Sequence, residues 1–282
     1  MIATILAGRG LLRLAMGIAL GSSLAACVQE PLEELPPPEP VFLEGYGPLE
    51  DDGYHLPGIP TEYLEGANHK VLILYPGDEE PGTVEVDPFA KFLYYVLEDG
   101  TALRYPIAVG REGKGLGGTT VIRRKAEWQG WTPTANMLRT EPEVYGPFAD
   151  GIPGDLSSPL GARALYLYRG GKDTYFRIHG TNDLGSIGNS GSAGCIRLFN
   201  QDIIDLFDRI EMGAKAVIRT YEDSLRIEGE ELANRGVELP PYIADPDAIN
   251  EAVAADPGPD LGESVERSEE HTSELQSQFR IS

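Results

Sequence analysis

Short runs of apolar, aromatic and β-branched residues, each ended by glycine, proline or aspartate, recur through the middle of the chain. Four of them occupy residues 70–75, 92–97, 102–109 and 119–126. Asp99-Gly100 separates the second run from the third and is typical of a tight hairpin turn. Two later runs, residues 160–168 and 174–179, flank Gly170-Gly171 and predict a second antiparallel pair, which ends at His179.

One segment has the spacing of a helix instead. Apolar residues recur at helical intervals between Ile203 and Ile210, Asn200 is a favourable N-cap, and Gly213 suits the position after the last turn. Residues 214–220 then return as a strand, residues 145–159 look like a long irregular loop, and residues 228–234 give only a weak helical signal. The pattern predicts a mainly β fold with one or a few short helices.

Charge divides the chain into a nearly neutral centre and two acidic flanks. Residues 27–68 carry ten carboxylates and no lysine or arginine, and residues 222–282 carry sixteen carboxylates against four arginines. We therefore expect a Pro- and acid-rich tether over 27–68, an ordered domain over 69–221 and a disordered acidic tail over 222–282, within which 267–282 resembles artificial run-on sequence. Nucleic-acid binding is excluded because no region has the cationic surplus that it requires.

The N-terminus predicts export. Arg9 and Arg13 precede an apolar run that is too short to span a membrane, and residues 1–26 end on small residues, as a signal peptide does. The sequence Leu-Ala-Ala-Cys ending at Cys27 resembles the lipobox of bacterial lipoproteins, in which the cysteine is acylated. That resemblance implies a lipid anchor at Cys27 on the periplasmic side of the cell envelope, at the outer membrane rather than the inner.

Cys195 then has no cysteine with which to form an intramolecular disulfide, in a compartment that favours disulfides. A cysteine attacks a carbonyl as its thiolate, so a neighbouring base must take the proton, and His179 is the candidate at the end of an ordered strand. Gly194 permits a backbone angle that would turn the amides of Ala193, Gly194 and Cys195 toward one point as an oxyanion hole. A buried structural cysteine and a redox-sensing thiol are the alternatives that these residues leave open.

A longer pattern surrounds these residues. Ile178-His179-Gly180-Thr181, Ser186-Ile187-Gly188 and the run from Ser192 to Leu198 together resemble the signature of the L,D-transpeptidase catalytic domain, over about residues 84–221. The resemblance implies a mixed β-sandwich or barrel-like fold. It also implies that Cys195 is the nucleophile, that His179 is the general base, and that the Gly180 carbonyl orients the imidazole.

The same resemblance suggests substrate-binding residues. Ser192, Arg197 and Thr181 would support the site or contact the substrate, and Trp131, beside a proline turn, would line a groove. Many family members carry histidine where this chain has Ala193, so we expect Ala193 to contribute only its backbone amide.

The reaction implied by the resemblance uses peptidoglycan stem peptides and needs no metal or organic cofactor. Cys195 would attack the carbonyl of the third stem residue, release D-alanine and pass the acyl group to an amine: another stem for a 3–3 cross-link, a lipoprotein lysine or a free D-amino acid. Carbapenems would acylate the same thiol. An L,D-carboxypeptidase or cross-link hydrolase, and a non-catalytic peptidoglycan-binding lipoprotein, are the alternatives. The sequence leaves the oligomeric state unknown.

Overall fold

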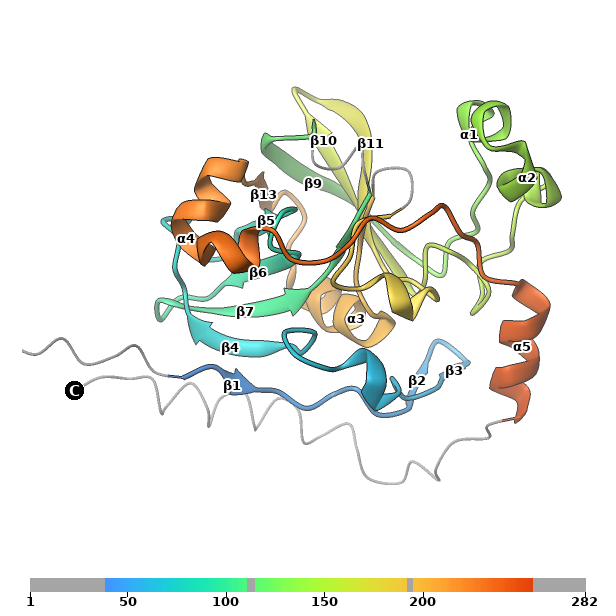
Figure 1. Ribbon diagram of the computed structural model, residues 1–282, viewed down its shortest axis with the longest axis horizontal. Helices are drawn as coiled ribbons and strands as arrows, with labels where there is room; N and C mark the ends of the chain where they lie inside the picture. The colour runs from blue at the N-terminus through green and yellow to red at the C-terminus, as the bar shows by residue number, and fades with distance from the viewer. Residues whose placement is uncertain (1–38, 111–114, 192–194, 256–282) are drawn as a thin grey trace, which may run out of the picture. The chain divides into compact units, whose positions relative to one another are not determined.

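The computed structural model describes residues 39–110, 115–191 and 195–255. Within these residues one mixed sheet has eleven strands in the order β1-β4-β7-β6-β5-β13-β9-β10-β11-β12-β8 (Figure 1). The strands are β1 (Val41–Phe42), β4 (Val71–Leu74), β5 (Val84–Asp87), β6 (Phe92–Val96), β7 (Thr101–Pro106), β8 (Ala108–Val109), β9 (Gly118–Glu127), β10 (Arg163–Arg169), β11 (Lys172–His179), β12 (Ile196–Arg197) and β13 (Lys215–Ile218). The mainly β fold predicted from the sequence is confirmed.

Both predicted hairpins are present. Strands β6 and β7 pair antiparallel, and in the turn between them Gly100 has a φ of 79° while Asp99 Oδ1 accepts a hydrogen bond from the Thr101 amide at 3.1 Å. Strands β10 and β11 also pair antiparallel, with Ala164 opposite His179. This second pair fixes the position of His179 at the last residue of a strand.

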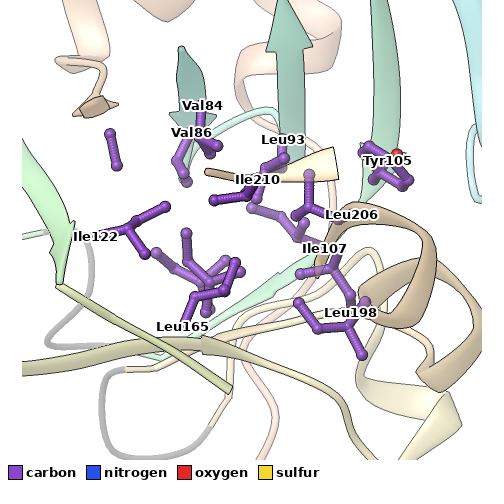
Figure 2. Close-up of a cluster of buried hydrophobic side chains, with 14 of the residues drawn as sticks. Val84, Val86, Leu93, Tyr105, Ile107, Ile122, Leu165, Leu198, Leu206 and Ile210 are labelled. Atoms are coloured by element: carbon purple, nitrogen blue, oxygen red, sulfur yellow. The ribbon is translucent and has the colours of Figure 1, made fainter. Parts of the chain in front are cut away.

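The main core is enclosed by the sheet and by α3 (Asn200–Arg209) (Figure 2). Leu72 of β4, near one end of the strand order, and Val109 of β8, at the other end, belong to the same buried cluster. Because strands from both ends contribute to one core, the sheet curls around it. The apolar stripe of α3 supplies Ile203, Leu206 and Phe207 to this cluster.

The predicted ends of α3 are wrong by a few residues. The N-cap is Phe199, which makes no side-chain capping bond, and Asn200 is the first helical residue. The Asn200 side chain instead accepts a hydrogen bond from the Ala162 amide at 2.9 Å, a tertiary contact that the local pattern did not reveal. The helix ends at Arg209, so Gly213 (φ 97°) lies in the following turn and not at the position directly after the cap.

The structure differs from the expected tether over its described part, residues 39–68. This part carries β1, the small hairpin of β2 (Leu49–Asp51) and β3 (Tyr54–Leu56), and the 3₁₀ turn η1 (Thr61–Tyr63). Asp51 accepts hydrogen bonds from Arg163 at 2.6 and 2.7 Å and from Trp128 Nε1 at 2.7 Å. The charge pattern assigned Asp51 to a solvated tether. In the structure its carboxylate is neutralised by the buried Arg163 of β10.

The acidic C-terminal flank also differs from expectation up to residue 255. It contains α4 (Tyr221–Ala233), which is kinked at Gly229, and α5 (Pro246–Ala255). Glu228 of α4 accepts a hydrogen bond from Arg219 Nη1 at 2.6 Å, and Arg219 also binds Glu85 and Asp87 of β5. The predicted run-on, residues 267–282, lies outside the described residues.

The stretch between β9 and β10 has more helix than expected. It contains α1 (Ala135–Thr140), capped by the Thr134 side chain, then α2 (Pro142–Tyr145) and the 3₁₀ turn η3 (Gly146–Phe148). The predicted irregular loop therefore begins after residue 148. No helix in the described parts of the chain is both long enough and apolar enough to cross a membrane.

Candidate active site

The site is built on the parallel pairing of β11 with β12, which places Ile178 opposite Ile196 and His179 opposite Arg197. Ile178 and Ile196 both lie in the core. Since successive side chains of a strand alternate between faces, His179 and Arg197 lie on the opposite face. Cys195 lies directly before β12, two residues from Arg197.

The hydrogen bonding between β12 and β8 continues one residue beyond both strands, because the Cys195 carbonyl accepts a hydrogen bond from the Gly110 amide at 3.0 Å. With strands about 4.8 Å apart and a rise of about 3.3 Å per residue, the Cα atoms of Cys195 and His179 are about 8 Å apart. Side chains at that separation on one face of a sheet can meet. Cys195 is half-buried. The register thus sets the residue nominated as base at the end of β11 and the residue nominated as nucleophile directly before the neighbouring β12.

His179 is only 3% exposed, and its Nδ1 lies 2.5 Å from the carbonyl oxygen of Gly180. A carbonyl can only accept, so Nδ1 carries the proton and the neutral ring keeps Nε2 as its acceptor. The predicted orienting role of Gly180 is consistent with this contact. Burial, and then the charge of Arg197, lower the pKa of His179 from 6.5 to about 3. The imidazole is therefore neutral near pH 7, in the state that can take a proton.

Gly180 is required for close packing. A Cβ on it would come within 2.2 Å of Asn200 Oδ1, the same atom that accepts from Ala162. The Gly180 amide donates to the Arg163 carbonyl at 3.0 Å, which continues the strand pairing one residue past His179. The backbone of Gly180, whose carbonyl faces His179 Nδ1, is thus fixed by strand pairing and by close packing against Asn200.

Arg197 and Thr181 organise the loop after β11. Arg197 is 8% exposed and its Nη1 donates to Asp183 Oδ2 at 3.1 Å. Thr181 is 1% exposed and its Oγ1 accepts from the Asp183 amide at 3.0 Å. Thr181 therefore shapes this loop from a buried position, whereas Arg197 also borders an open pocket.

That pocket has a volume of about 300 Å³. Its lining residues include Asp183, Ser186 and Arg197 and, from the C-terminal flank, Leu239, Pro240 and Tyr242. Neither Cys195 nor His179 is among its lining residues, so the pocket lies beside the pair and shares Arg197 with it. Leu239, Pro240 and Tyr242 were not predicted as site residues from the sequence, because they lie in a tail that was expected to be disordered. The one sequence signal there is the alternation of Val237 and Leu239 before Pro240-Pro241.

Trp131 does not line this pocket. It pairs through its backbone with Ile152, at 2.9 and 2.7 Å, and its ring centroid lies 6.2 Å from that of Tyr145. These contacts give it a structural role in the stretch between β9 and β10. The other tryptophan, Trp128, packs in a small core cluster with Leu56 and Ala162.

Four of the sequence candidates lie outside the described residues: Ser192, and Ala193 and Gly194 of the expected oxyanion hole, and the expected anchor Cys27. In the described ranges, no group of three or more histidine, cysteine, aspartate or glutamate side chains is arranged to hold a metal ion.

Fold and site thus combine a curled mixed sheet with a histidine at the end of one strand and a cysteine directly before the parallel strand beside it. Comparison with known proteins identifies a family for this chain. Residues 81–218 match the model of the YkuD family, described as the L,D-transpeptidase catalytic domain. The chain is 31% identical over 150 residues to the putative L,D-transpeptidase YkuD of Bacillus subtilis, which covers 52% of this chain and 73% of that relative.

The chain is also 29% identical over 188 residues to the probable L,D-transpeptidase YbiS of Escherichia coli, covering 65% of this chain and 59% of that protein. A solved structure from Brucella melitensis, described as a probable carnitine operon oxidoreductase, is 43% identical to this chain and covers 54% of this chain and 95% of its own, with a TM-score of 0.38. This chain belongs to the family of L,D-transpeptidase catalytic domains.

Proposed function

We propose that the protein is a cell-wall L,D-transpeptidase that uses Cys195 as its nucleophile and His179 as its general base. The observation that supports this most directly is the register of β11 and β12, which sets His179 opposite Arg197, two residues after Cys195, with His179 Nδ1 2.5 Å from the Gly180 carbonyl oxygen. Membership of the family supports the same chemistry.

In the first half of the proposed reaction, His179 Nε2 takes the thiol proton and the Cys195 sulfur attacks the carbonyl carbon of the third residue of a tetrapeptide stem. The backbone amides of Ala193, Gly194 and Cys195 stabilise the oxyanion. The bond to the terminal D-alanine breaks, His179 returns the proton to the leaving amine, and a thioester remains.

In the second half an amine attacks the thioester, loses a proton to His179 and leaves with the acyl group, which restores the thiol. The candidate acceptors are the side chain of another stem, a lipoprotein lysine and a free D-amino acid. Water as acceptor would give L,D-carboxypeptidase activity from the same intermediate, so the product formed with and without an added amine separates transpeptidase from carboxypeptidase.

Intact-mass measurement tests the proposal. Wild-type protein incubated with a tetrapeptide stem or a carbapenem should gain one acyl adduct, and Cys195→Ala should gain none while keeping its thermal unfolding midpoint. Absence of an adduct on the wild type, or an adduct that survives Cys195→Ala, would overturn the catalytic proposal and favour a non-catalytic peptidoglycan-binding protein. Analysis of muropeptides after incubation with purified sacculi would then identify the acceptor.

The proposed location is the periplasmic side of the envelope, with the chain anchored through an acylated Cys27 at the outer membrane. The support is the signal-like N-terminus ending in Leu-Ala-Ala-Cys. Two or three acyl chains give stable attachment, which a single chain does not. Cys27→Ala should move the protein from the membrane fraction to the soluble fraction, and an unchanged distribution would contradict the anchor.

A further inference from the structure

A segment outside the matched domain reaches the loop before the nucleophile. Residues 235–239, called here the C-terminal strap, lie beyond the end of the family match at residue 218. Figure 1 shows the strap within the connection between α4 and α5. The strap pairs in parallel with residues 187–191, called here the approach loop because the chain continues from them to Cys195. The acidic C-terminal flank thus provides a backbone partner for the loop that leads to the nucleophile.

Strand β8 binds one edge of the approach loop. The Val109 amide donates to the Asn189 carbonyl at 3.3 Å, and the Gly191 amide donates to the Val109 carbonyl at 3.2 Å. These bonds leave the amide and the carbonyl of Ser190 pointing to the other edge, because successive backbone groups of an extended segment alternate in direction.

The strap binds that other edge. The Ser190 amide donates to the Val237 carbonyl at 2.8 Å, and the Leu239 amide donates to the Ser190 carbonyl at 2.6 Å. The Val237 amide donates to Asn189 Oδ1 at 3.0 Å. Ser190 is only 3% exposed, so its backbone groups need protein partners, and the strap provides both. The approach loop is therefore held between β8 and the strap.

Two glycines allow the strap and the approach loop to lie this close together. Gly236 has a φ of 79°, and a Cβ on it would come within 2.1 Å of the Gly188 carbonyl oxygen. A Cβ on Gly191 would come within 3.0 Å of Leu239 Cβ. The contact at Gly236 has no room for any side chain, so the position of the strap depends on glycine there.

The beginning of the strap is fixed to the body of the fold and to the N-terminal flank. The Arg235 guanidinium lies over the ring of the buried Phe92 of β6, 4.5 Å from its centroid. Arg235 Nη2 also donates to Asn68 Oδ1 at 2.9 Å, and Asn68 Nδ2 donates to the Ile187 carbonyl of the approach loop at 3.4 Å. Asn68 precedes the family match, which begins at residue 81. Both flanks of the matched domain therefore meet at the approach loop.

Building on the proposed function, we propose that the strap and Asn68 are positioning elements for acylation, which fix the approach loop and through it the backbone around Cys195. Hydrogen-bond donors stabilise an oxyanion well only when they are held in place before the reaction. The strap and Asn68 act through the loop and touch neither the substrate nor the sulfur. The matched domain alone, residues 81–218, contains neither of them.

The test compares two reactions of the same thiol, because a loss of stability alone would not separate them. Acylation by a tetrapeptide stem passes through an oxyanion and depends on positioned amides. Alkylation by iodoacetamide forms no oxyanion and depends on thiolate character and access. Both rate constants can be measured by intact mass on the full chain, with the thermal unfolding midpoint recorded for each variant.

Gly236→Ala is the principal variant, because its new Cβ collides with the Gly188 carbonyl. It should lower the rate constant for acylation about 10- to 100-fold, the scale of effect of a small misplacement at a catalytic site. Its rate constant for alkylation should change by less than about twofold. The matched control is Gly229→Ala, which has the same φ of 79° and no atom within 4 Å of the new Cβ, so it carries the same backbone strain and should change neither rate.

Asn68 offers a second, milder test with its own rescue. Asn68→Ala removes the acceptor of Arg235 and the donor to Ile187, and should slow acylation about fivefold, the effect of losing one net hydrogen bond. Asn68→Asp keeps an oxygen for Arg235 and should recover most of the wild-type rate.

Acylation of Gly236→Ala as fast as that of Gly229→Ala would overturn this inference, and so would equal losses of acylation and alkylation. Should Gly236→Ala not fold, the Asn68 variants decide, because equal acylation by Asn68→Ala and the wild type would also overturn it. Failure of the proposed function has a different signature, since the wild type itself would then form no acyl-enzyme with the stem.

Discussion

Two clusters of buried polar side chains, one around Arg219 and one around His179, hold basic groups whose pKa values move in opposite directions. Arg219 binds Glu85, Asp87 and Glu228, all with side chains at most 8% exposed, and despite burial these hydrogen bonds and charges raise its pKa. Burial, followed by the charge of Arg197, lowers the pKa of His179, although the hydrogen bond from Nδ1 to the Gly180 carbonyl opposes the shift. Carboxylates around a buried basic group fix its charge, whereas burial beside a cation and without a carboxylate leaves the imidazole neutral and able to accept a proton.

The largest effect is expected from removing the base. His179→Gln should lower kcat/KM for acyl transfer about 10²- to 10⁴-fold, the usual contribution of a positioned general base. The rate would be followed by release of D-alanine. The control is His69→Gln, because His69 makes only edge-on ring contacts with Phe42 and Tyr46 among the interactions described and lies outside the site. Comparable loss in the two variants would contradict the role of His179.

The second effect tests the neutralised cluster. Arg219→Met leaves three buried carboxylates without their cation and should lower the free energy of unfolding by about 3–5 kcal/mol, measured by urea denaturation. Arg226→Met is the matched control, since Arg226 is 62% exposed at the side chain and pairs with Asp223 at the surface of α4. That variant should lose less than about 1 kcal/mol. A loss for Arg219→Met as small as for the control would show that the cluster does not hold α4.

These clusters also explain what the sequence could and could not predict. The sequence nominates His179, Gly180 and Cys195 because the local motif contains all three and the hairpin before it has clear alternation. Glu228 and Asp51 were assigned to disordered flanks, because composition counts a carboxylate without knowing that Arg219 or Arg163 lies beside it. Asn200 failed as an N-cap for the same reason, since its partner Ala162 is 38 residues away.

Asp202 is an intermediate case. It tests whether a buried carboxyl group, whose charge nearby cations only partly balance, lowers the free energy of unfolding. Burial raises the pKa of Asp202 from 3.8 to about 7, and the nearby charge of Lys70 offsets only part of this. Between pH 4 and 7 the unfolded state is ionised while the folded state holds the proton, so the unfolded state binds fewer protons and stability should fall as pH rises. The loss reaches at most about 1.4 kcal/mol per pH unit in this window.

Asp202→Asn should flatten this slope, because the amide does not titrate while its oxygen can still accept the hydrogen bond from Tyr46. Asp208→Asn, at an exposed position on the same helix, should leave the slope unchanged. Urea denaturation at a series of pH values from 4 to 8 provides the measurement. A slope that persists in Asp202→Asn would mean that another group binds the proton.

The smallest expected effect comes from Arg197→Gln, which removes one charge near His179. It therefore tests the contrast between the His179 and Arg219 clusters most directly. Arg197 lowers the pKa of His179, so Arg197→Gln should raise that pKa and move the acidic limb of the kcat/KM profile to higher pH, by about one unit for a close charge in a partly screened site. Burial, the larger cause, remains in the variant, so the pKa should stay below 6.5. Arg177→Gln is the control, because Arg177 lowers the pKa of His179 less than Arg197 does and is held by two hydrogen bonds to Asp173. Its acidic limb should move less, and equal displacement in both variants would show that general positive charge, and not Arg197, keeps the imidazole neutral.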